Sequence, residues 1–189
     1  MIQQRIQESI DLKVKILADK DLLSRIERAA EFIVEAYRSG NKTLFCGNGG
    51  SAADAQHLAA ELSGKFLIDR APLHAEACHV NSSFLTAVSN DFGFDRAYAR
   101  YIQSVGKAGD VLVAISTSGN SENVILAVKQ ARQMGFTCIV LSGSTGGLMA
   151  ELADLLINIP SDHTPRIQEA HILIGHIICE LVEGELFGE

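Results

Sequence analysis

Residues 43–64 constrain the fold of this chain more than any other stretch, and they read T-L-F-C-G-N-G-G-S-A-A-D-A-Q-H-L-A-A-E-L-S-G. The apolar run over 43–46 predicts a buried strand. A glycine-rich turn follows, and Ser51 is a favoured N-cap for a helix over 52–62. Such a turn leaves backbone N–H groups and the positive end of a helix free to bind an anion or a carbonyl oxygen. Its glycine spacing fits neither the dinucleotide-binding fingerprint nor the P-loop, which argues against both of these nucleotide sites.

The remainder of the chain alternates apolar, strand-like runs with helical segments. Further strands are predicted over residues 75–80, 110–116, 137–142 and 155–159, with helices over 82–88, 95–104, 123–134 and 166–186 and a short one from 148. The run over 110–116 is almost continuously apolar, which is typical of a parallel strand covered on both faces. We therefore expect an α/β fold: a single doubly wound domain over residues 1–189, with a mainly parallel five-stranded sheet and helices on both faces in an α-β-α sandwich.

Two helices are predicted before this core, within residues 1–39, as an N-terminal extension. The second ends at Ser39-Gly40, which is a normal C-terminal signal. The first carries a narrow apolar seam at helical spacing, formed by Ile2, Ile6, Ile10, Val14 and Leu17. We expect the seam to pack on another subunit; packing on the protein's own core is the alternative.

Charge and cysteine usage limit the class of protein. The net charge of −7 argues against a nucleic-acid or anionic-membrane partner, although a small anionic substrate remains compatible with it. The four cysteines lie in apolar segments without C-x-x-C spacing, which indicates buried free thiols in a reducing compartment. The N-terminus has no signal-peptide pattern and no apolar run approaches the ~20 residues of a membrane span, so we expect a cytoplasmic protein.

A second candidate site follows the strand over 110–116. It reads S-T-S-G-N-S and offers four hydroxyl groups at the start of a helix, without any lysine or arginine, from Ser116, Thr117, Ser118 and Ser121. Ligands bind at the carboxyl ends of strands in open α/β sheets, and hydroxyls with helix N–H groups suit a phosphate monoester. The alternative is an ordinary Ser/Thr-rich turn.

A third candidate group lies on the last helix, where Gln168, His171, Gly175 and His176 share one broad face with Ile172. His57 and Glu61, at i and i+4 on the early helix, offer a complementary pair. Imidazole and carboxylate ligands suit zinc or a similar divalent ion, whereas hydrogen-bonded core or surface histidines are the alternative. Gly175 destabilises a helix, and close packing at that level is a reason for it.

Four motifs together resemble the sugar isomerase (SIS) domain family over nearly the whole chain: residues 45–64, N-D-F-G-F, I-S-T-S-G-N-S and R-I-Q-E-A-H, in this order. The resemblance implies a homotetramer with active sites between subunits. It also implies reversible conversion of sedoheptulose 7-phosphate to D-glycero-D-manno-heptose 7-phosphate in bacterial heptose biosynthesis, without an organic cofactor.

The same resemblance implies roles for individual residues. Glu61 and His176 form the acid/base pair. Zinc is surrounded by His57, Glu61, Gln168 and His176. The substrate is contacted by Asn48, Gly49, Gly50, Glu61, Asn90, Asp91, Ser116, Thr117, Ser118, Ser121 and Gln168. One departure is Asn81, where the family has an acid, and it affects the sugar contacts or the loop structure.

A non-catalytic relative is the alternative function. The same fold serves as a sugar-phosphate sensor and as a protein that binds the bacterial replication initiator. In the latter, the acid matching Glu61 and the imidazole matching His176 are absent, whereas this chain has both. The sequence therefore favours an aldose–ketose isomerase, in which a positioned carboxylate moves a proton between adjacent carbons through an enediol(ate).

Overall fold

Five parallel strands form the centre of the protein, in the order β2-β1-β3-β4-β5. The computed structural model describes residues 1–188. In chain order the elements are α1 (Ile2–Ala18), α2 (Lys20–Arg38), β1 (Thr43–Gly47), α3 (Gly50–Ser63), β2 (Ala75–Ala77), α4 (Ser82–Phe92), η1 (Phe94–Arg96), α5 (Ala97–Val105), β3 (Val111–Ser116), α6 (Glu122–Gln133), β4 (Thr137–Ser142), η2 (Gly147–Leu152), β5 (Leu155–Asn158) and α7 (Thr164–Phe187).

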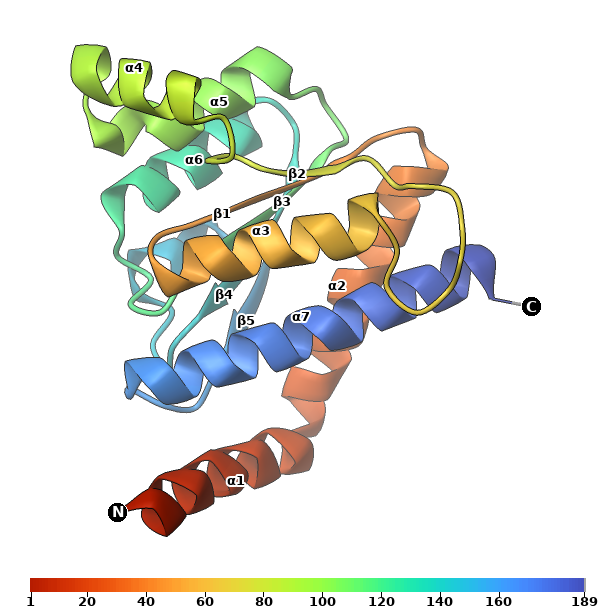
Figure 1. The fold of residues 1–189 in the computed structure, drawn as a ribbon, viewed down its shortest axis with the longest axis vertical. Coiled ribbons are helices and arrows are strands. Elements are labelled where there is room, and N and C mark those ends of the chain that lie inside the picture. Colours follow the sequence, from red (N-terminus) through yellow and green to blue (C-terminus); the bar gives the residue numbers. More distant parts are fainter. Residues whose placement is uncertain (189) are drawn as a thin grey trace.

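The two central strands are buried along their whole length, as their apolar sequences require. Side chains alternate between the two faces of a strand, so successive residues enter different cores. Phe45 and Val113 pack in the core that α2, α3 and α7 share, whereas Leu44 and Leu112 pack in the core under α5 and α6. Figure 1 shows these two helical layers on either side of the sheet. The predicted α-β-α sandwich is confirmed, and every strand pair within residues 1–188 is parallel.

The strand order reverses direction between β1 and β3. From β1 the chain passes through α3 to β2 at one edge, and from β3 it passes through α6 to β4 on the other side. In a doubly wound sheet, a ligand binds at this switch point, outside the carboxyl ends of the strands. The glycine turn after β1 and the hydroxyl-rich loop after β3 therefore lie side by side, because Gly47 pairs with Ile115.

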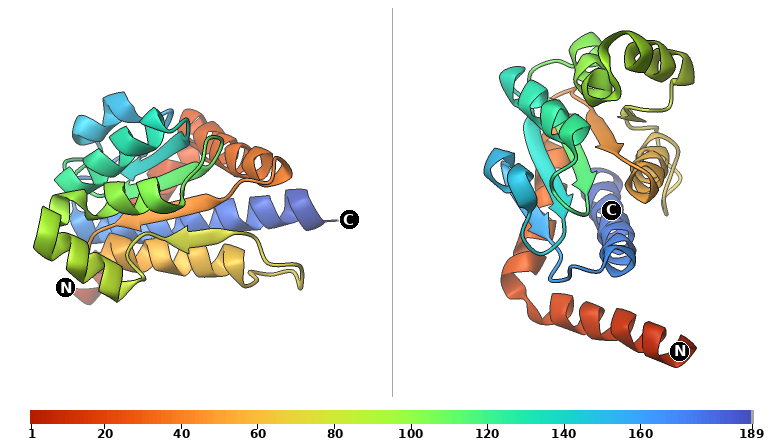
Figure 2. Two further views of the ribbon diagram at one scale, coloured as in Figure 1. Left: turned by 90° about the horizontal axis from the view of Figure 1, so that it is seen from above. Right: turned by 90° about the vertical axis from the view of Figure 1, so that its left-hand side faces the viewer.

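Helix α1 extends away from the sheet and packs on the body by only one of its faces (Figure 2). Its buried residues are Leu12 and Ile16. The predicted apolar seam lies on a different face and is exposed, with exposed fractions from 48% at Ile10 to 73% at Ile2. In the single chain, the seam does not pack on the protein's own core.

The helix after the glycine turn begins earlier than predicted. Gly49 is the N-cap and has φ of +56°, a conformation that favours glycine, so α3 starts at Gly50. The prediction of Ser51 as the N-cap was wrong, because Ser51 lies inside the first turn and is buried.

Two further expectations concern the thiols and the membrane. All four cysteines are free and buried, as predicted. Burial raises the pKa of Cys138 and of Cys179 to about 12. Among residues 1–188, the helices all fall short of the length and apolar character that crossing a membrane would need.

Candidate active site

A pair of amides joins the two loops at the switch point. Asn48 Nδ2 donates to Asn123 Oδ1 and Asn123 Nδ2 donates to Asn48 Oδ1, both at 2.8 Å. The Tyr98 hydroxyl donates to the Gly47 carbonyl at 2.7 Å and lies 3.2 Å from Asn48 Oδ1. The side chain of Asn48 therefore holds the glycine turn against the start of α6. Asn123 and Tyr98 were not predicted, since a single amide or tyrosine has no distinguishing spacing in the sequence.

The glycine turn also meets the start of the last helix. A Cβ atom on Gly50 would collide with the side-chain amide of Gln168. Glycine at this position is therefore what lets α3 begin directly beside Gln168 of α7. The structure thus brings two of the predicted substrate residues, Gly50 and Gln168, into one place.

The four predicted hydroxyls lie together in the loop that leads into α6. Ser116 Oγ and Ser121 Oγ are 3.0 Å apart and share one hydrogen bond, and Ser118 Oγ accepts from the N–H of Asn120 at 3.1 Å. Ser118 and Thr117 keep their O–H donors for a ligand, as does one hydroxyl of the Ser116–Ser121 pair. Together with the N-terminus of α6, these O–H groups offer hydrogen-bond donors and a positive helix end to an anion.

A neighbouring segment holds this cup in place. The N–H of Leu148 donates to Asn120 Oδ1 at 2.9 Å, and the N–H of Gly143 donates to the Thr117 carbonyl at 3.0 Å. Gly119 lies so close to the backbone of Gly146 that a Cβ atom would collide with it. The cup is therefore preorganised before any ligand binds.

Three side chains from two helices meet in an acid/base cluster. His57 Nε2 lies 2.9 Å from Glu61 Oε1 on α3, and His176 Nε2 of α7 lies 3.1 Å from His57 Nε2. The side chain of Glu61 is 23% exposed and that of His57 49%, so a ligand can reach both. Imidazole and carboxylate groups in contact can relay a proton among a substrate's carbons and oxygens.

Close packing of α3 on α7 brings this cluster together. A Cβ atom on Gly175 would lie 2.5 Å from Leu58 Cδ1, so a larger residue would push the two helices apart. Leu58 follows His57, and Gly175 precedes His176. The predicted reason for Gly175 therefore agrees with the structure.

The same three residues fit a divalent metal ion. Their possible ligand atoms all lie within 4.8 Å of one another. Two ligands about 2.0–2.1 Å from a tetrahedral zinc ion are about 3.3–3.4 Å apart, close to the observed His57–His176 separation. Gln168 lies two helical turns before His176, about 12 Å along the axis, next to Gly50.

Asp54 is a further acidic group near the cluster. It lies one turn before His57 on α3, and its Oδ2 atom is buried without a partner among residues 1–188. Burial raises the pKa of Asp54, while the nearby His57 and His176 lower it. A single aspartate on a helix carries no such signal in the sequence, so this residue was not predicted.

His171, on the predicted face of α7, lies in the core rather than in the cluster. It is fully buried, its Nε2–H donates to the Ser142 carbonyl at 3.1 Å, and its Nδ1 has no partner in the described chain. Burial lowers the pKa of His171 to about 4, and the hydrogen bond to Ser142 opposes this shift only in part.

This buried imidazole should make the fold sensitive to acid. Its folded pKa lies below the unfolded value of about 6.5, so the unfolded chain takes up the proton first as the pH falls. The neutral imidazole of His171 makes its full contribution to the free energy of unfolding above pH 6.5. Roughly 3 kcal/mol of that free energy should be lost as the pH falls from 6.5 to 4. Denaturant titrations across this range measure it. His171→Gln should remove that part of the slope, and an identical pH profile in the variant would contradict this account.

Among residues 1–188, the side chains of Asn90 and Asp91 make no hydrogen bond to the cup or to the acid/base cluster. They occupy the exposed last turn of α4, where Asn90 Nδ2 donates to Asp91 Oδ1 at 2.9 Å. Helix α4 packs mainly on η1 and α5. It runs to Phe92, further than the predicted end at residue 88, and so includes these two residues.

Asn81 has a structural role at the other end of the same helix. It is the N-cap of α4, and its Oδ1 accepts from the N–H of Phe84 at 3.0 Å. Asparagine and aspartate cap helices about equally well. The exchange of an acid for Asn81 therefore keeps the local structure of this loop.

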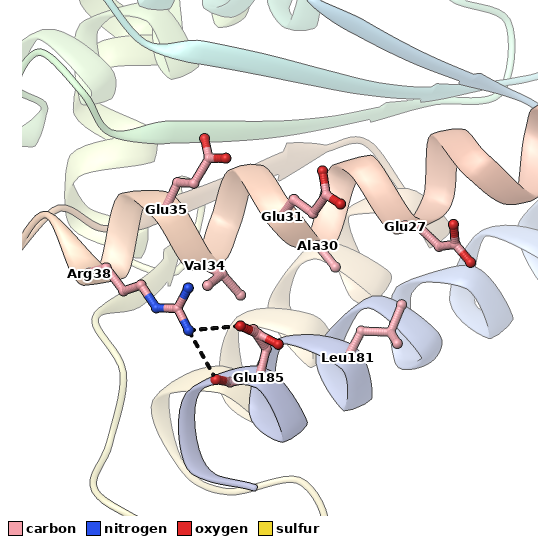
Figure 3. Close-up of a pocket in the computed structure, with 8 residues that line it drawn as sticks. All are labelled: Glu27, Ala30, Glu31, Val34, Glu35, Arg38, Leu181 and Glu185. Carbon is pink, nitrogen blue, oxygen red and sulfur yellow. Dashed lines mark hydrogen bonds and ion pairs between the residues drawn. The ribbon is translucent and has the colours of Figure 1, made fainter.

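A separate groove lies between α2 and α7 (Figure 3). It is lined by Glu27, Ala30, Glu31, Val34, Glu35, Arg38, Leu181 and Glu185. Figure 3 shows Arg38 bonded to Glu185, while three more carboxylates stand along α2. This acidic rim would repel a phosphate group, so the groove is not the substrate site.

The sequence matches known proteins over most of its length. Residues 10–143 match the model of the SIS domain family. The phosphoheptose isomerase of Clostridium acetobutylicum is 50% identical over 188 residues, covering 100% of this chain and 96% of that protein. The structure of the phosphoheptose isomerase GmhA from Neisseria gonorrhoeae is 43% identical with a TM-score of 0.89, covering 97% of this chain and 100% of that one. A phosphoheptose isomerase from Francisella tularensis is 35% identical with a TM-score of 0.91, covering 96% and 95% respectively.

Proposed function

The chain belongs to the SIS domain family, and we infer from its full-length similarity to phosphoheptose isomerases that it acts as one. The enzyme interconverts sedoheptulose 7-phosphate and D-glycero-D-manno-heptose 7-phosphate in bacterial heptose biosynthesis. The observation that carries this function is the row of contacts from Glu61 to His57 and from His57 to His176, at one end of a site whose other end is the proposed phosphate cup.

The dimensions of the site suit this substrate. Gly50, beside the switch point, and His57 are seven residues apart on α3, which is about 10 Å along the helix axis. That length is comparable with an extended seven-carbon sugar phosphate. Ser116, Thr117, Ser118 and Ser121 would hold the phosphate, and the carbonyl end would reach Glu61.

The reaction needs two proton transfers that balance. We assign Glu61 as the base that takes the proton from C1 of the ketose and returns it to C2 of the aldose, through an enediol(ate). His176 moves the second proton between the two oxygens. Backbone N–H groups of the turn at Asn48, Gly49 and Gly50 would stabilise the developing negative charge. Gln168, Asn90 and Asp91 would bind the sugar hydroxyls.

We assign one zinc ion per subunit to His57, Glu61, Gln168 and His176, and no organic cofactor. Within one chain Gln168 lies about 12 Å along α7 from His176, so a neighbouring subunit would supply the Gln168 ligand. When bound, the metal supplies a Lewis acid that polarises the sugar oxygens. Tight coordination of Glu61 and His176 would weaken both as bases, so the metal is either catalytic and leaves them partly free, or mainly structural.

An assay of the purified protein tests the function. Sedoheptulose 7-phosphate should be converted in a discontinuous assay, and binding without turnover would favour the non-catalytic alternative. Treatment with a chelator should lower activity, and added zinc should restore it. Full activity of metal-free protein would mean that the cluster residues act as acids and bases without a metal ion.

We further propose that the single domain of residues 1–189 works in the cytoplasm as a homotetramer, with sites completed between subunits. The exposed seam of α1 supports this assembly. So does a second exposed apolar stripe on α7, formed by Leu173, Ile177 and Leu181 at four-residue spacing. In the single chain the apolar side chains of both stripes are at least 36% exposed, and contact with another subunit would remove them from water.

Disruption of the seam should therefore dissociate the protein. Deletion of residues 1–18, or the milder double change Ile6→Asp with Ile10→Asp, should give a smaller species that has lost activity although every motif residue remains. Light scattering coupled to gel filtration measures the mass. Gln4→Asp, an exposed polar position on the same helix, is the control. A monomeric and fully active seam variant would overturn the assembly.

A further inference from the structure

A buried ion pair behind the acid/base cluster takes no part in the reaction described above. Arg70 Nε lies 2.9 Å from Glu183 Oε1, and the two side chains are only 2% and 1% exposed. Arg70 belongs to the loop that follows α3, and Glu183 lies two helical turns after His176 on α7. A buried charge pair stabilises a fold little unless further hydrogen bonds satisfy it, so its partners indicate its role.

The carboxylate of Glu183 anchors the loop. It accepts the backbone N–H groups of Phe66, Leu67 and Ile68 at 3.1, 2.6 and 2.8 Å. Burial would raise the pKa of Glu183, but these three N–H groups and Arg70 lower it, so the group is ionised. Three consecutive N–H groups on one carboxylate hold this stretch of backbone in a single conformation.

The guanidinium of Arg70 caps the end of α3. It donates to the carbonyl oxygens of Glu61 at 3.0 Å, Leu62 at 2.8 Å and Gly64 at 3.1 Å. The last carbonyl groups of a helix lack partners within it and favour a cation. Arg70 thus bonds directly to the backbone of the residue we assign as the base.

The anchored loop also reaches the other half of the cluster. The ring of Phe66 stacks on His176, with centroids 5.5 Å apart and planes inclined by 23°. The Arg70–Glu183 pair therefore contacts the surroundings of both proposed catalytic residues. Arg70 bonds to the backbone carbonyl of Glu61, and the loop held by Glu183 places Phe66 against His176.

We propose that Arg70 and Glu183 are positioning residues for the isomerisation, which hold Glu61 and His176 in register and keep Phe66 against His176. The proposal rests on the proposed function, and neither residue touches the sugar. Because a small misplacement of a catalytic group is costly, loosening the pair should lower kcat. It should leave the Michaelis constant nearly unchanged, since the phosphate cup belongs to other elements.

Steady-state kinetics of two conservative variants test the proposal. Glu183→Gln removes the charge, and Arg70→Lys keeps the charge but cannot span three carbonyls. Each should lower kcat at least ~10-fold, with the Michaelis constant changed less than about threefold. The matched control is Glu185→Gln, which breaks the exposed pair of Glu185 with Arg38 between α7 and α2 and should leave kcat unchanged. Folded variants with kcat within twofold of the parent would overturn the proposal.

A spectroscopic probe separates positioning from mere stability. The chain contains no tryptophan, so Phe66→Trp introduces a single reporter at the ring that stacks on His176. In this background, Glu183→Gln should move the emission maximum to longer wavelength as the indole becomes exposed, and Glu185→Gln should not. An unmoved maximum would overturn the proposal. The fluorescence measurement does not depend on isomerase activity. A parent protein without isomerase activity would refute the proposed function and leave the fluorescence test of the loop anchor valid.

A third variant tests the proposal if the two charge variants do not fold. If neither Glu183→Gln nor Arg70→Lys folds, Phe66→Leu removes the ring and leaves the ion pair intact. It should lower kcat several-fold in a protein whose melting temperature is close to that of the parent. An unchanged kcat in Phe66→Leu would then overturn the proposed positioning role.

Discussion

Glu61→Gln is expected to lower kcat by at least ~100-fold while the protein stays folded. The glutamine amide keeps the shape of the carboxylate and can still bond to His57, but it cannot accept a proton from carbon. The loss should therefore fall on kcat rather than on the Michaelis constant. Steady-state kinetics, with circular dichroism as the check on folding, measure this effect.

The control for this variant is Glu180→Gln, an exposed glutamate on α7 one turn after His176. It changes the net charge equally and should retain the parent's activity. The metal content of Glu61→Gln should be measured as well, because the same carboxylate is a proposed zinc ligand. A near-normal kcat would remove Glu61 from the mechanism.

Ser118→Ala combined with Ser121→Ala should weaken the binding of phosphorylated sugars by at least ~100-fold. A hydrogen bond to a charged group contributes about 1.5–3 kcal/mol, and 1.4 kcal/mol is a factor of ten, so two lost bonds reach this range. The folded structure should change little, because the hydroxyls bond mainly to each other and to Asn120 within the loop. Titration calorimetry with the sugar phosphate measures the dissociation constant.

Two exposed serines at helix ends provide the matched control. Ser39→Ala with Ser63→Ala removes the same number of hydroxyls outside the cup and should leave binding unaffected. Unchanged affinity in the cup variant would mean that the phosphate binds elsewhere on the protein.

The parts of this structure that sequence could predict are those with local periodicity. The buried strands, the seam of α1 and the hydroxyl loop after β3 each depend on neighbouring residues, whose spacing determines the face on which they lie. Gly175 shows how far such reasoning extends. Because glycine destabilises a helix, Gly175 indicated close packing at that level. The sequence did not indicate that the packing partner would be Leu58.

The parts that sequence could not predict depend on contacts between distant residues. Asn48 and Asn123 are ordinary loop and helix-start residues until the sheet brings them together. Arg70 and Glu183 look like solvated charges in a chain that is 21% charged, although both are almost fully buried. The convergence of His57 with His176 is of the same kind, because spacing within one helix carries no information about its partner.

The parallel sheet has a consequence for how fast this protein folds. None of its strand pairs within residues 1–188 is a hairpin, so each must be assembled across an intervening segment, as when Thr43 meets Val111. Such long-range contacts cost loop entropy before they contribute any stabilisation, which slows folding. Meanwhile T-L-F-C-G and V-L-V-A-I-S remain exposed as unpaired apolar edges. The yield of soluble protein should therefore depend on temperature and chain concentration during synthesis more than on the stability of the finished fold.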